Sequence, residues 1–367
     1  MHTVSVETLR GWLERGEPVT VVDVRPAAER AEWRIPGSIH ADVYEALKAG
    51  DLGALAGMDL PTGMPVVTVC GAGRTSLIAA QQLQGRGLQA LSLEGGMKAW
   101  SLAWNSAEVP MPGSQARLVQ VRRTGKGCLS YLIGSGETAA VIDPSLPPGV
   151  YLDLARSWGW KIAYVLETHV HADHLSRARR LSELSGAGLC LPGQQRVCFP
   201  FAALEDGSAL AIGGAELRAL RTPGHTLEST CYLLEGRALF TGDTLFLGAV
   251  GRPDLHADLQ EARARARLLY ASLQRLLGLP VQTLVLPGHT SEPVAFDHQP
   301  LYALLEEVRD HLDLLRFGED AFVETLLARL PPTPPNYQRI IGLNEAGELP
   351  EGDSADLEAG ANRCAVA

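Results

Sequence analysis

A short segment of the chain concentrates side chains that can bind a metal ion. It reads Thr-His-Val-His-Ala-Asp-His and contains His169, His171, Asp173 and His174. An apolar run at 162–166 comes just before it and predicts a buried strand. Where a strand ends, alternate side chains project to one side of the sheet edge, so His169 and His171 can converge on one point. Imidazole and carboxylate are usual ligands of zinc and iron, so the segment predicts a metal site.

Further candidate ligands lie in three later loops, in keeping with the need of a metal ion for ligands from more than one loop. Each stands beside glycine after an apolar run: His225, Asp243 and His289. Together with the dense segment they make seven side chains of ligand type. A metal centre accounts for all of them at once. The remaining histidines are expected to be solvated or capping residues: His2, His40, His256, His298 and His311.

A second candidate site is a cysteine in a glycine-containing loop. Cys70 ends a β-rich run at 66–70, and the loop Gly71, Ala72, Gly73 leads into a predicted helix at 75–84. Two glycines let the backbone curl so that amide N–H groups face inward, and the helix N-terminus adds its positive end. A thiol held there is a candidate nucleophile in an anion-binding cup. A buried packing cysteine is the alternative reading of the same pattern.

A dinucleotide-binding loop is the other alternative for this segment, with Glu94 as the ribose ligand. The loop reads G-x-G-x-x-S and lacks the third glycine of the dinucleotide fingerprint. The first strand of the fold also lies elsewhere in the chain, at 19–24. We therefore reject this alternative.

Composition and charge exclude several classes of function. Hydrophobic residues make up 46% of the 367 residues and charged residues 20%, as in ordinary soluble globular proteins. The net charge is −10 without a basic block, so no nucleic-acid partner is expected. No signal pattern and no apolar run near the roughly 18 residues of a membrane span occur, so no membrane partner is expected. Six scattered cysteines fit reduced thiols, and we expect a cytoplasmic protein.

The alternation of elements predicts two domains and an appendage. Strand and helix patterns alternate over the first hundred residues, which favours a small parallel α/β sheet. A turn-rich stretch with Pro110, Pro112 and Gly113 marks a boundary. The segment 345–360 is expected to be poorly ordered. The expected divisions are a first domain at 1–106, a linker at 107–116, a second domain at 117–300, a helical extension at 301–344 and a tail at 345–367.

The order of the candidate ligands, H-x-H-x-D-H, then G-H, G-D and G-H, resembles that of the metallo-β-lactamase superfamily. This resemblance implies an α+β, four-layered αββα sandwich with the metal site at one edge, followed here by C-terminal helices. The fold alone does not set the chemistry, because hydrolases and oxygenases share it.

The first hundred residues resemble a rhodanese domain. The resemblance rests on Asp-Val-Arg at 23–25, on 32–40, on the Cys70 loop and on Leu-Glu-Gly-Gly-Met-Lys-Ala-Trp at 93–100. It implies an α/β domain in which Cys70 carries sulfane sulfur and thiosulfate or sulfite are sulfur partners. The implied catalytic pair is Cys70 with Arg74, and the implied sulfur-binding loop is Gly71, Ala72, Gly73, Arg74 and Thr75. Many members place arginine five positions after the cysteine, whereas here Arg74 stands at four and Thr75 at five.

Several later segments resemble bacterial persulfide dioxygenases related to the human ethylmalonic-encephalopathy protein. They are 243–246, 251–255, 334–340 and 362–364. The resemblance implies one Fe(II) per chain on His169, His225 and Asp243, and oxidation of glutathione persulfide by O2 to sulfite. On this reading four residues do not bind the iron but orient its ligands or handle protons: His171, Asp173, His174 and His289. Arg252 is then the candidate that grips the substrate, and a homodimer is a further expectation.

A binuclear zinc thioester hydrolase similar to glyoxalase II is the alternative. In it His169, His171 and His225 would hold one ion, Asp173, His174 and His289 the other, and Asp243 would bridge them. The ligand motifs do not choose between the two reactions. The rhodanese-like domain favours the dioxygenase, since rhodaneses handle sulfane sulfur, which is the dioxygenase's substrate.

Overall fold

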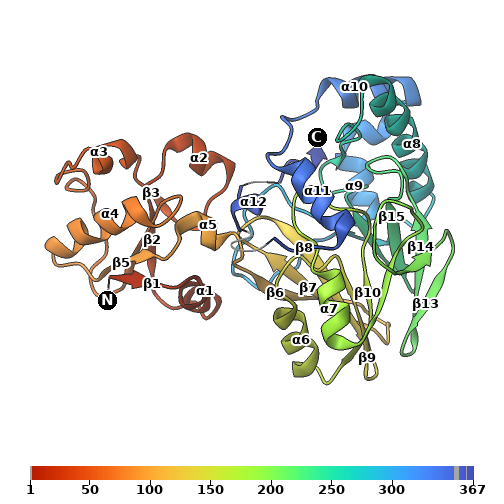
Figure 1. Ribbon diagram of the computed structural model, residues 1–367, viewed down its shortest axis with the longest axis horizontal. Coiled ribbons are helices and arrows are strands. Elements are labelled where there is room, and N and C mark those ends of the chain that lie inside the picture. The colour runs from red at the N-terminus through yellow and green to blue at the C-terminus, as the bar shows by residue number, and fades with distance from the viewer. Residues whose placement is uncertain (1, 351–354, 361) are drawn as a thin grey trace.

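The computed structural model describes residues 2–350, 355–360 and 362–367 (Figure 1). Its N-terminal part is a five-stranded parallel sheet in the order β1-β5-β4-β2-β3. The strands are β1 (Thr3–Val4), β2 (Thr20–Asp23), β3 (Ile39–His40), β4 (Val66–Val69) and β5 (Ala90–Leu93). The helices are α1 (Val6–Glu14), α2 (Ala27–Glu32), α3 (Tyr44–Lys48), α4 (Arg74–Gly85) and α5 (Gly96–Trp100). Strand β4, Val-Val-Thr-Val, is buried throughout, as expected for a central strand of a parallel sheet.

The second part is built on two sheets. The seven-stranded sheet has the order β12-β11-β10-β9-β8-β7-β6. Its strands are β6 (Asn105–Val109), β7 (Arg117–Arg123), β8 (Cys128–Ser135), β9 (Thr138–Ile142), β10 (Lys161–Leu166), β11 (Gly188–Pro192) and β12 (Ala202–Leu204). The six-stranded sheet has the order β13-β14-β15-β16-β18-β19. Its strands are β13 (Ala209–Ile212), β14 (Ala215–Arg221), β15 (Thr230–Leu234), β16 (Ala238–Gly242), β18 (Leu284–Pro287) and β19 (Ala303–Leu304).

The two sheets pack face to face through an apolar core. Tyr131 and Leu166 of the first sheet share this core with Tyr232 and Phe240 of the second. Helices α6 (Pro148–Ser157) and α7 (Ala178–Ser185) cover the outer face of the first sheet, and α8 (Leu259–Leu277), α9 (Leu305–His311) and α10 (Glu319–Ala328) cover that of the second. The predicted fold, an α/β domain followed by an αββα sandwich with C-terminal helices, is confirmed.

The C-terminal region differs from its expected disorder. Helix α11 (Tyr337–Ala346) is followed by α12 (Ala355–Glu358) and by β20 (Ala365–Val366), which pairs with β17 (Val250–Gly251). Expected disorder is therefore wrong for 355–360, whereas 351–354 lie outside the described residues. The cause is tertiary: local composition is rich in Gly, Glu and Ala, but the segment is held by contacts with the sandwich.

Two further segments are more broken or more ordered than their patterns indicate. The helical pattern from residue 301 is divided into β19, α9, a 3₁₀ turn (Asp313–Arg316) and α10. Residues 107–109 of the expected linker belong to β6, which pairs with β7. The predicted domain boundaries themselves remain a prediction.

A turn between β7 and β8 joins the two parts of the chain. Arg123 donates from Nε to the Ser101 carbonyl at 2.7 Å, and Gly125 donates its N–H to the Ala103 carbonyl at 3.1 Å. Trp33 reaches the same turn and donates from Nε1 to the Thr124 carbonyl at 3.1 Å. The N-terminal sheet is thereby anchored next to the start of β8.

Among the described residues, none of the helices combines the length and the apolar character that crossing a bilayer requires.

Glu358 is the charged centre of the C-terminal contact. Its carboxylate is fully buried, lies 3.3 Å from Arg123 Nη1 and from Arg177 Nη2, and accepts the Leu175 N–H at 2.7 Å. Burial alone would raise the pKa of Glu358, but the charges of Arg123 and Arg177 outweigh burial and lower it.

Glu358→Gln should therefore lower the free energy of unfolding by about 3–5 kcal/mol, because it removes the carboxylate that the fully buried Arg123 guanidinium faces. Chemical denaturation followed by circular dichroism measures this. The matched control is Glu324→Gln, which removes an exposed partner of Arg263 and should leave the transition nearly unchanged. An equal effect in both variants would contradict the assignment.

The ion pairs of Glu358 also predict that the stability of the protein depends on pH. Since the folded pKa of Glu358 is lowered, its stabilisation is complete above the unfolded pKa of about 4.3 and is lost as the pH falls through the folded value. The gap in stability between wild type and Glu358→Gln should thus be largest near neutral pH and shrink in acid.

Candidate metal centre

The first ligand group stands where three strands of the sandwich end. His169 follows β10, His225 follows β14 and Asp243 follows β16. Nε2 of His169 lies 3.8 Å and Nε2 of His225 lies 3.7 Å from Oδ2 of Asp243. Within the part of the chain that the structure describes, the buried His169 Nε2 and Asp243 Oδ2 have no hydrogen-bond partner. Buried polar atoms without partners are rare, so this geometry fits a metal ion between the three side chains.

Hydrogen bonds on the far side of each imidazole set its orientation. His225 donates from Nδ1 to the Arg252 carbonyl at 2.8 Å, so its Nε2 is free to face Asp243. Nδ1 of His169 lies 2.9 Å from the Thr168 hydroxyl. The glycine before Asp243 also has a role, because Gly242 adopts a φ of +48° and a Cβ there would meet Thr168 Oγ1 at 2.5 Å.

A second ligand group adjoins the first. It consists of Cys128, Asp173, His174 and His289, all buried, with ligand atoms within 4.8 Å of one another. His289 Nε2 lies 2.8 Å from Asp173 Oδ2, yet it makes no hydrogen bond to any described residue. Nδ1 of His289 lies 2.6 Å from Oδ1 of Asp243, so these two side chains connect the groups. The arrangement has the donor types of a second metal position.

His171 lies between the two groups, with its ring centroid 4.2 Å from that of His169 and 4.1 Å from that of His174, but its Nε2 faces other partners. Its Nε2 lies 2.7 Å from Glu167 Oε2 and 3.3 Å from Asp143 Oδ1. Asp143 also accepts the backbone N–H and the hydroxyl of Thr168, at 2.7 and 2.8 Å. The structure thus divides the seven predicted ligands into three in the first group, three in the second and His171 in a carboxylate cluster of its own.

Close packing of these groups shifts their pKa values in opposite directions. Burial lowers the pKa of His169 well below its ordinary value, and the neighbouring His171 adds to this. For His289, burial would lower the pKa, but Asp173 and Asp243 raise it well above the ordinary value. Burial would raise the pKa of Asp243, but His289 outweighs it and lowers the pKa. For Cys128, burial would raise the pKa, but His174 and His289 bring it down to about 6.

Several residues of the centre escaped prediction from the sequence. Cys128, Asp143 and Glu167 belong to the clusters, and Asn344 and Asn362 support them. Asn344 donates to the carbonyls of His171 and His174, and Asn362 donates to Asp173 Oδ2 at 2.9 Å. Sequence position could have indicated two of them, because Asp143 ends an apolar strand and Glu167 directly precedes the dense segment.

Arg252 does not have the predicted role of a substrate-gripping residue in this structure. Its side chain is buried, and all five N–H donors have protein acceptors. Two of them bind Asp254 at 2.8 Å, and the others bind the carbonyls of Pro331, Pro332 and Arg363. No donor is left for a substrate, so Arg252 ties the Pro-rich and C-terminal segments to the loop that orients His225.

The Cys70 loop curls back on the segment that follows β5. The carbonyls of Cys70 and Gly71 accept the N–H groups of Met97 and Lys98 at 2.8 and 3.0 Å. The Cys70 thiol lies 3.2 Å from the Ser76 hydroxyl in the first turn of α4. Gly73 precedes that helix with a φ of +82° and lies too close to the Gly95 backbone for a Cβ. Arg74 and Thr75 are the first residues of α4.

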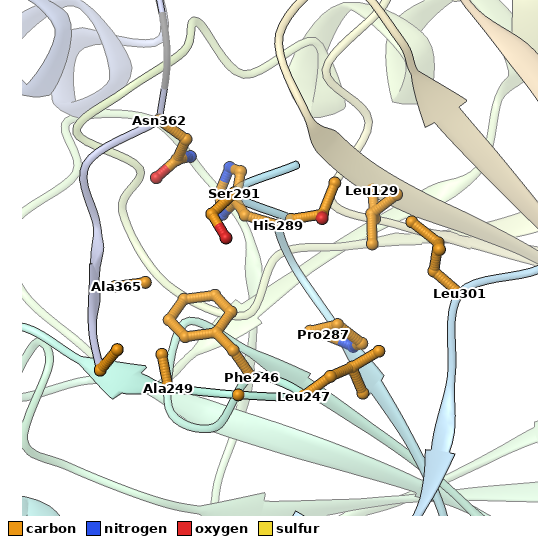
Figure 2. A pocket seen from close by; sticks show the side chains of 13 residues that line it. Leu129, Phe246, Leu247, Ala249, Pro287, His289, Ser291, Leu301, Asn362 and Ala365 are labelled. Carbon is orange, nitrogen blue, oxygen red and sulfur yellow. The ribbon is translucent and has the colours of Figure 1, made fainter. Parts of the chain in front are cut away.

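One cavity opens beside the second ligand group and has a volume of about 220 Å³. Figure 2 shows His289, Ser291 and Asn362 on one side of it, with Phe246 and Leu129 among the apolar side chains that line the rest. The metal centre is therefore accessible from a mostly apolar space on the His289 side.

A second cavity, of about 180 Å³, lies beside the first ligand group. His225 lines it together with Arg196 and Arg265. Arg196 is paired with Glu228 at 2.8 Å and Glu345 at 2.9 Å. Nε of Arg265 is buried and has no hydrogen-bond partner among the residues described. Two arginines and two glutamates line this space, and the Arg265 Nε is the donor among them that is left for a further acceptor.

Two family models match the chain. The model of the metallo-beta-lactamase superfamily matches residues 123–289, and the rhodanese-like domain model matches residues 5–103. These ranges contain the ligand motifs and the Cys70 loop, respectively.

Curated relatives match part of the chain. A hydroxyacylglutathione hydrolase of Rhodospirillum rubrum is 39% identical over 170 residues, which cover 43% of this chain and 60% of the relative. One from Methylococcus capsulatus is 33% identical over 230 residues, which cover 59% of this chain and 86% of the relative. The chain thus spans less than two thirds of the first of these relatives but most of the second.

Two solved structures share the sandwich. A metallo-beta-lactamase of Staphylococcus aureus has a TM-score of 0.59 at 24% identity, with 64% of this chain and 75% of that chain covered. ETHE1 from Myxococcus xanthus has a TM-score of 0.55 at 27% identity, with 63% of this chain and 98% of that chain covered. The first likeness shows the fold alone.

The curated relatives overturn the predicted persulfide dioxygenase activity. Those with 33–39% identity are named hydroxyacylglutathione hydrolases. The prediction rests on the rhodanese-like domain and on four later segments, and the only metal ligand among these, Asp243, belongs to the hydrolase reading as well. A physical reason for the correction is the second ligand group, which a centre with a single iron does not require. On the ligand motifs, the two family models and the relatives, the chain belongs to the metallo-β-lactamase superfamily and carries a rhodanese-like domain ahead of the metal centre.

Proposed function

We propose that the chain is a metal-dependent hydrolase of a glutathione thioester. The observation that carries this proposal is the pair of adjoining ligand groups joined by the 2.6 Å contact of Asp243 and His289, in a chain similar to hydroxyacylglutathione hydrolases. Zinc is the proposed ion, two per chain, because imidazole and carboxylate donors suit it.

Asp243 has the central position in this proposal. Its Oδ2 faces His169 and His225, and its Oδ1 faces His289 in the second group. Zinc ions held by the two groups would polarise the thioester carbonyl and lower the pKa of a water molecule toward neutrality. The Asp243 carboxylate, fixed from both sides, then sets the spacing of the two groups.

The leaving group of a thioester is a thiol, which needs little acid catalysis from the protein. A thiol has a pKa of about 8.5, so glutathione can depart near neutral pH with little need of a proton from an acid. This agrees with the absence of an unpaired acidic side chain in the described lining of either cavity beside the centre: Glu228 and Glu345 are both paired with Arg196.

The charged cavity beside His225 is the proposed place of the glutathione carboxylates. Arg265 donates from Nη1 to the Leu255 carbonyl at 3.1 Å, which fixes the side chain and leaves the buried Nε to be satisfied. A carboxylate bound there would satisfy Nε through a charge-assisted hydrogen bond.

The central test is hydrolysis of S-lactoylglutathione by the zinc-loaded protein, measured as release of free thiol. Asp243→Ala should lower kcat/KM by more than the roughly 10–100-fold typical of a residue that only orients a ligand, and should release bound zinc. His171→Ala should retain most of the zinc, because its ring faces Glu167 and Asp143. No thiol release by the wild type, or equal zinc loss in both variants, would contradict the proposal.

Arg265→Met tests the substrate cavity. Loss of one charge-assisted bond worth about 1.5–3 kcal/mol should raise KM about tenfold or more while zinc content stays constant. Arg263→Met is the matched control, because Arg263 lies on the same helix but pairs with Glu324 at the surface. A KM unchanged in Arg265→Met would remove Arg265 from the substrate site.

We also infer that the rhodanese-like domain accepts sulfur on Cys70. The supporting observation is the curled loop, whose thiol faces the Ser76 hydroxyl at the start of a 12-residue helix. Attack of the thiolate on the outer sulfur of thiosulfate would form a persulfide on the protein and release sulfite.

Mass spectrometry of the protein after thiosulfate treatment should find one added sulfur atom on Cys70. Cys70→Ser should abolish this addition, because a hydroxyl does not ionise near neutral pH, yet leave thioester hydrolysis intact. The exposed Cys198 is the control thiol. Sulfur on Cys198 alone would show that the loop is not the sulfur acceptor.

A further inference from the structure

Cys128 opens strand β8 and projects its thiol into the second ligand group. Its Sγ lies 3.6 Å from Asp173 Oδ2 and 3.9 Å from His174 Nδ1, and the side chain is 1% exposed. The backbone fixes this position, because a bridge pairs Cys128 with His289 and the next residue, Leu129, donates its N–H to the Gly288 carbonyl at 2.8 Å.

The atoms around this thiol are spaced for a shared cation. Tetrahedral zinc with Zn–S near 2.3 Å and Zn–N near 2.0–2.1 Å separates neighbouring ligand atoms by about 3.3–3.6 Å. Both Sγ distances are close to this range. Moreover, the buried Nε2 of His289 lies 2.8 Å from Asp173 Oδ2 but has no hydrogen-bond partner in the described parts of the chain. A buried imidazole nitrogen without a partner points to a missing ligand at this place.

We propose that Cys128 is a thiolate ligand of the second metal ion, together with Asp173, His174 and His289. This inference rests on the two-ion centre of the proposed function. Other buried thiols have different surroundings: Cys190 packs in the apolar core between the sheets, and Cys231 lies 3.2 Å from the Thr222 hydroxyl. Cys128 is the one described cysteine whose Sγ lies within 4.8 Å of every ligand atom of an imidazole and carboxylate group.

A thiolate changes which metal the second position selects. Thiolate is a soft donor that favours zinc, whereas carboxylate and water ligands suit manganese and magnesium. The second position of the wild type should therefore retain zinc against a larger excess of manganese than a variant without the thiol does.

X-ray absorption spectroscopy of the zinc-loaded, full-length protein tests the assignment directly. Wild type should show a sulfur scatterer at about 2.3 Å from zinc. Cys128→Ser should lose it. Cys128→Asp, which offers a carboxylate in place of the thiolate, should also lose the sulfur but keep the second zinc ion. Circular dichroism checks that each variant is folded.

Cys364→Ser is the matched control, because Cys364 is also buried and also lies near the centre. The charge of Asp243 adds to burial in raising the pKa of the Cys364 thiol. This variant should keep the sulfur signal. No sulfur signal in the wild type, or its loss in Cys364→Ser and survival in Cys128→Ser, would overturn the inference. Hydrolysis is measured separately. A wild type without thioesterase activity would contradict the proposed function. An active wild type that binds two zinc ions without a sulfur scatterer would contradict only the role of Cys128.

Discussion

Burial of ligand atoms without protein partners is the constraint on which the rest of the structure depends. Nε2 of His169 and Oδ2 of Asp243 in the first group, and Nε2 of His289 in the second, have no hydrogen bond among the described residues. Leaving a buried polar group unsatisfied costs about 1–3 kcal/mol. Such atoms stay in place only because the two packed sheets hold the strand ends that carry them, and because an ion can satisfy them together.

Hydrogen bonds around the centre fix the residues that carry these ligand atoms. The Arg252 carbonyl holds one imidazole by its far nitrogen, and Asn344 fixes the carbonyls on either side of Asp173. Arg252 in turn ties three carbonyls of the C-terminal third to the His225 loop. Residues far from any reacting atom thereby hold the ligands at a separation suited to metal binding.

Features carried by local pattern could be predicted from the sequence, whereas features made by distant contacts could not. The strand before His169 and the glycines beside His225, Asp243 and His289 are local, and they indicated both the sandwich and its ligands. The inward turn of Cys128 follows from a bridge to His289, and the order of the tail follows from Glu358, whose two arginine partners lie 181 and 235 residues away. No window of the sequence contains both sides of such contacts. The choice of reaction also lay outside local pattern, since identical ligands serve hydrolases and oxygenases.

The long separation between Arg123 and Glu358 has a consequence for how the protein is made. The N-terminal sheet is complete in sequence at residue 93, where β5 ends, so it can fold while the rest is still being synthesised. By contrast, Arg123 is synthesised 235 residues before its carboxylate partner Glu358. At 5–20 residues per second, translation of that stretch takes about 10–50 s. During that interval the other strands of the sandwich are synthesised in the absence of the buried counter-charge and of strand β20. The donors that fix Asp173 and the carbonyls of His171 and His174, from Asn362 and Asn344, are likewise synthesised only after every ligand of the metal centre.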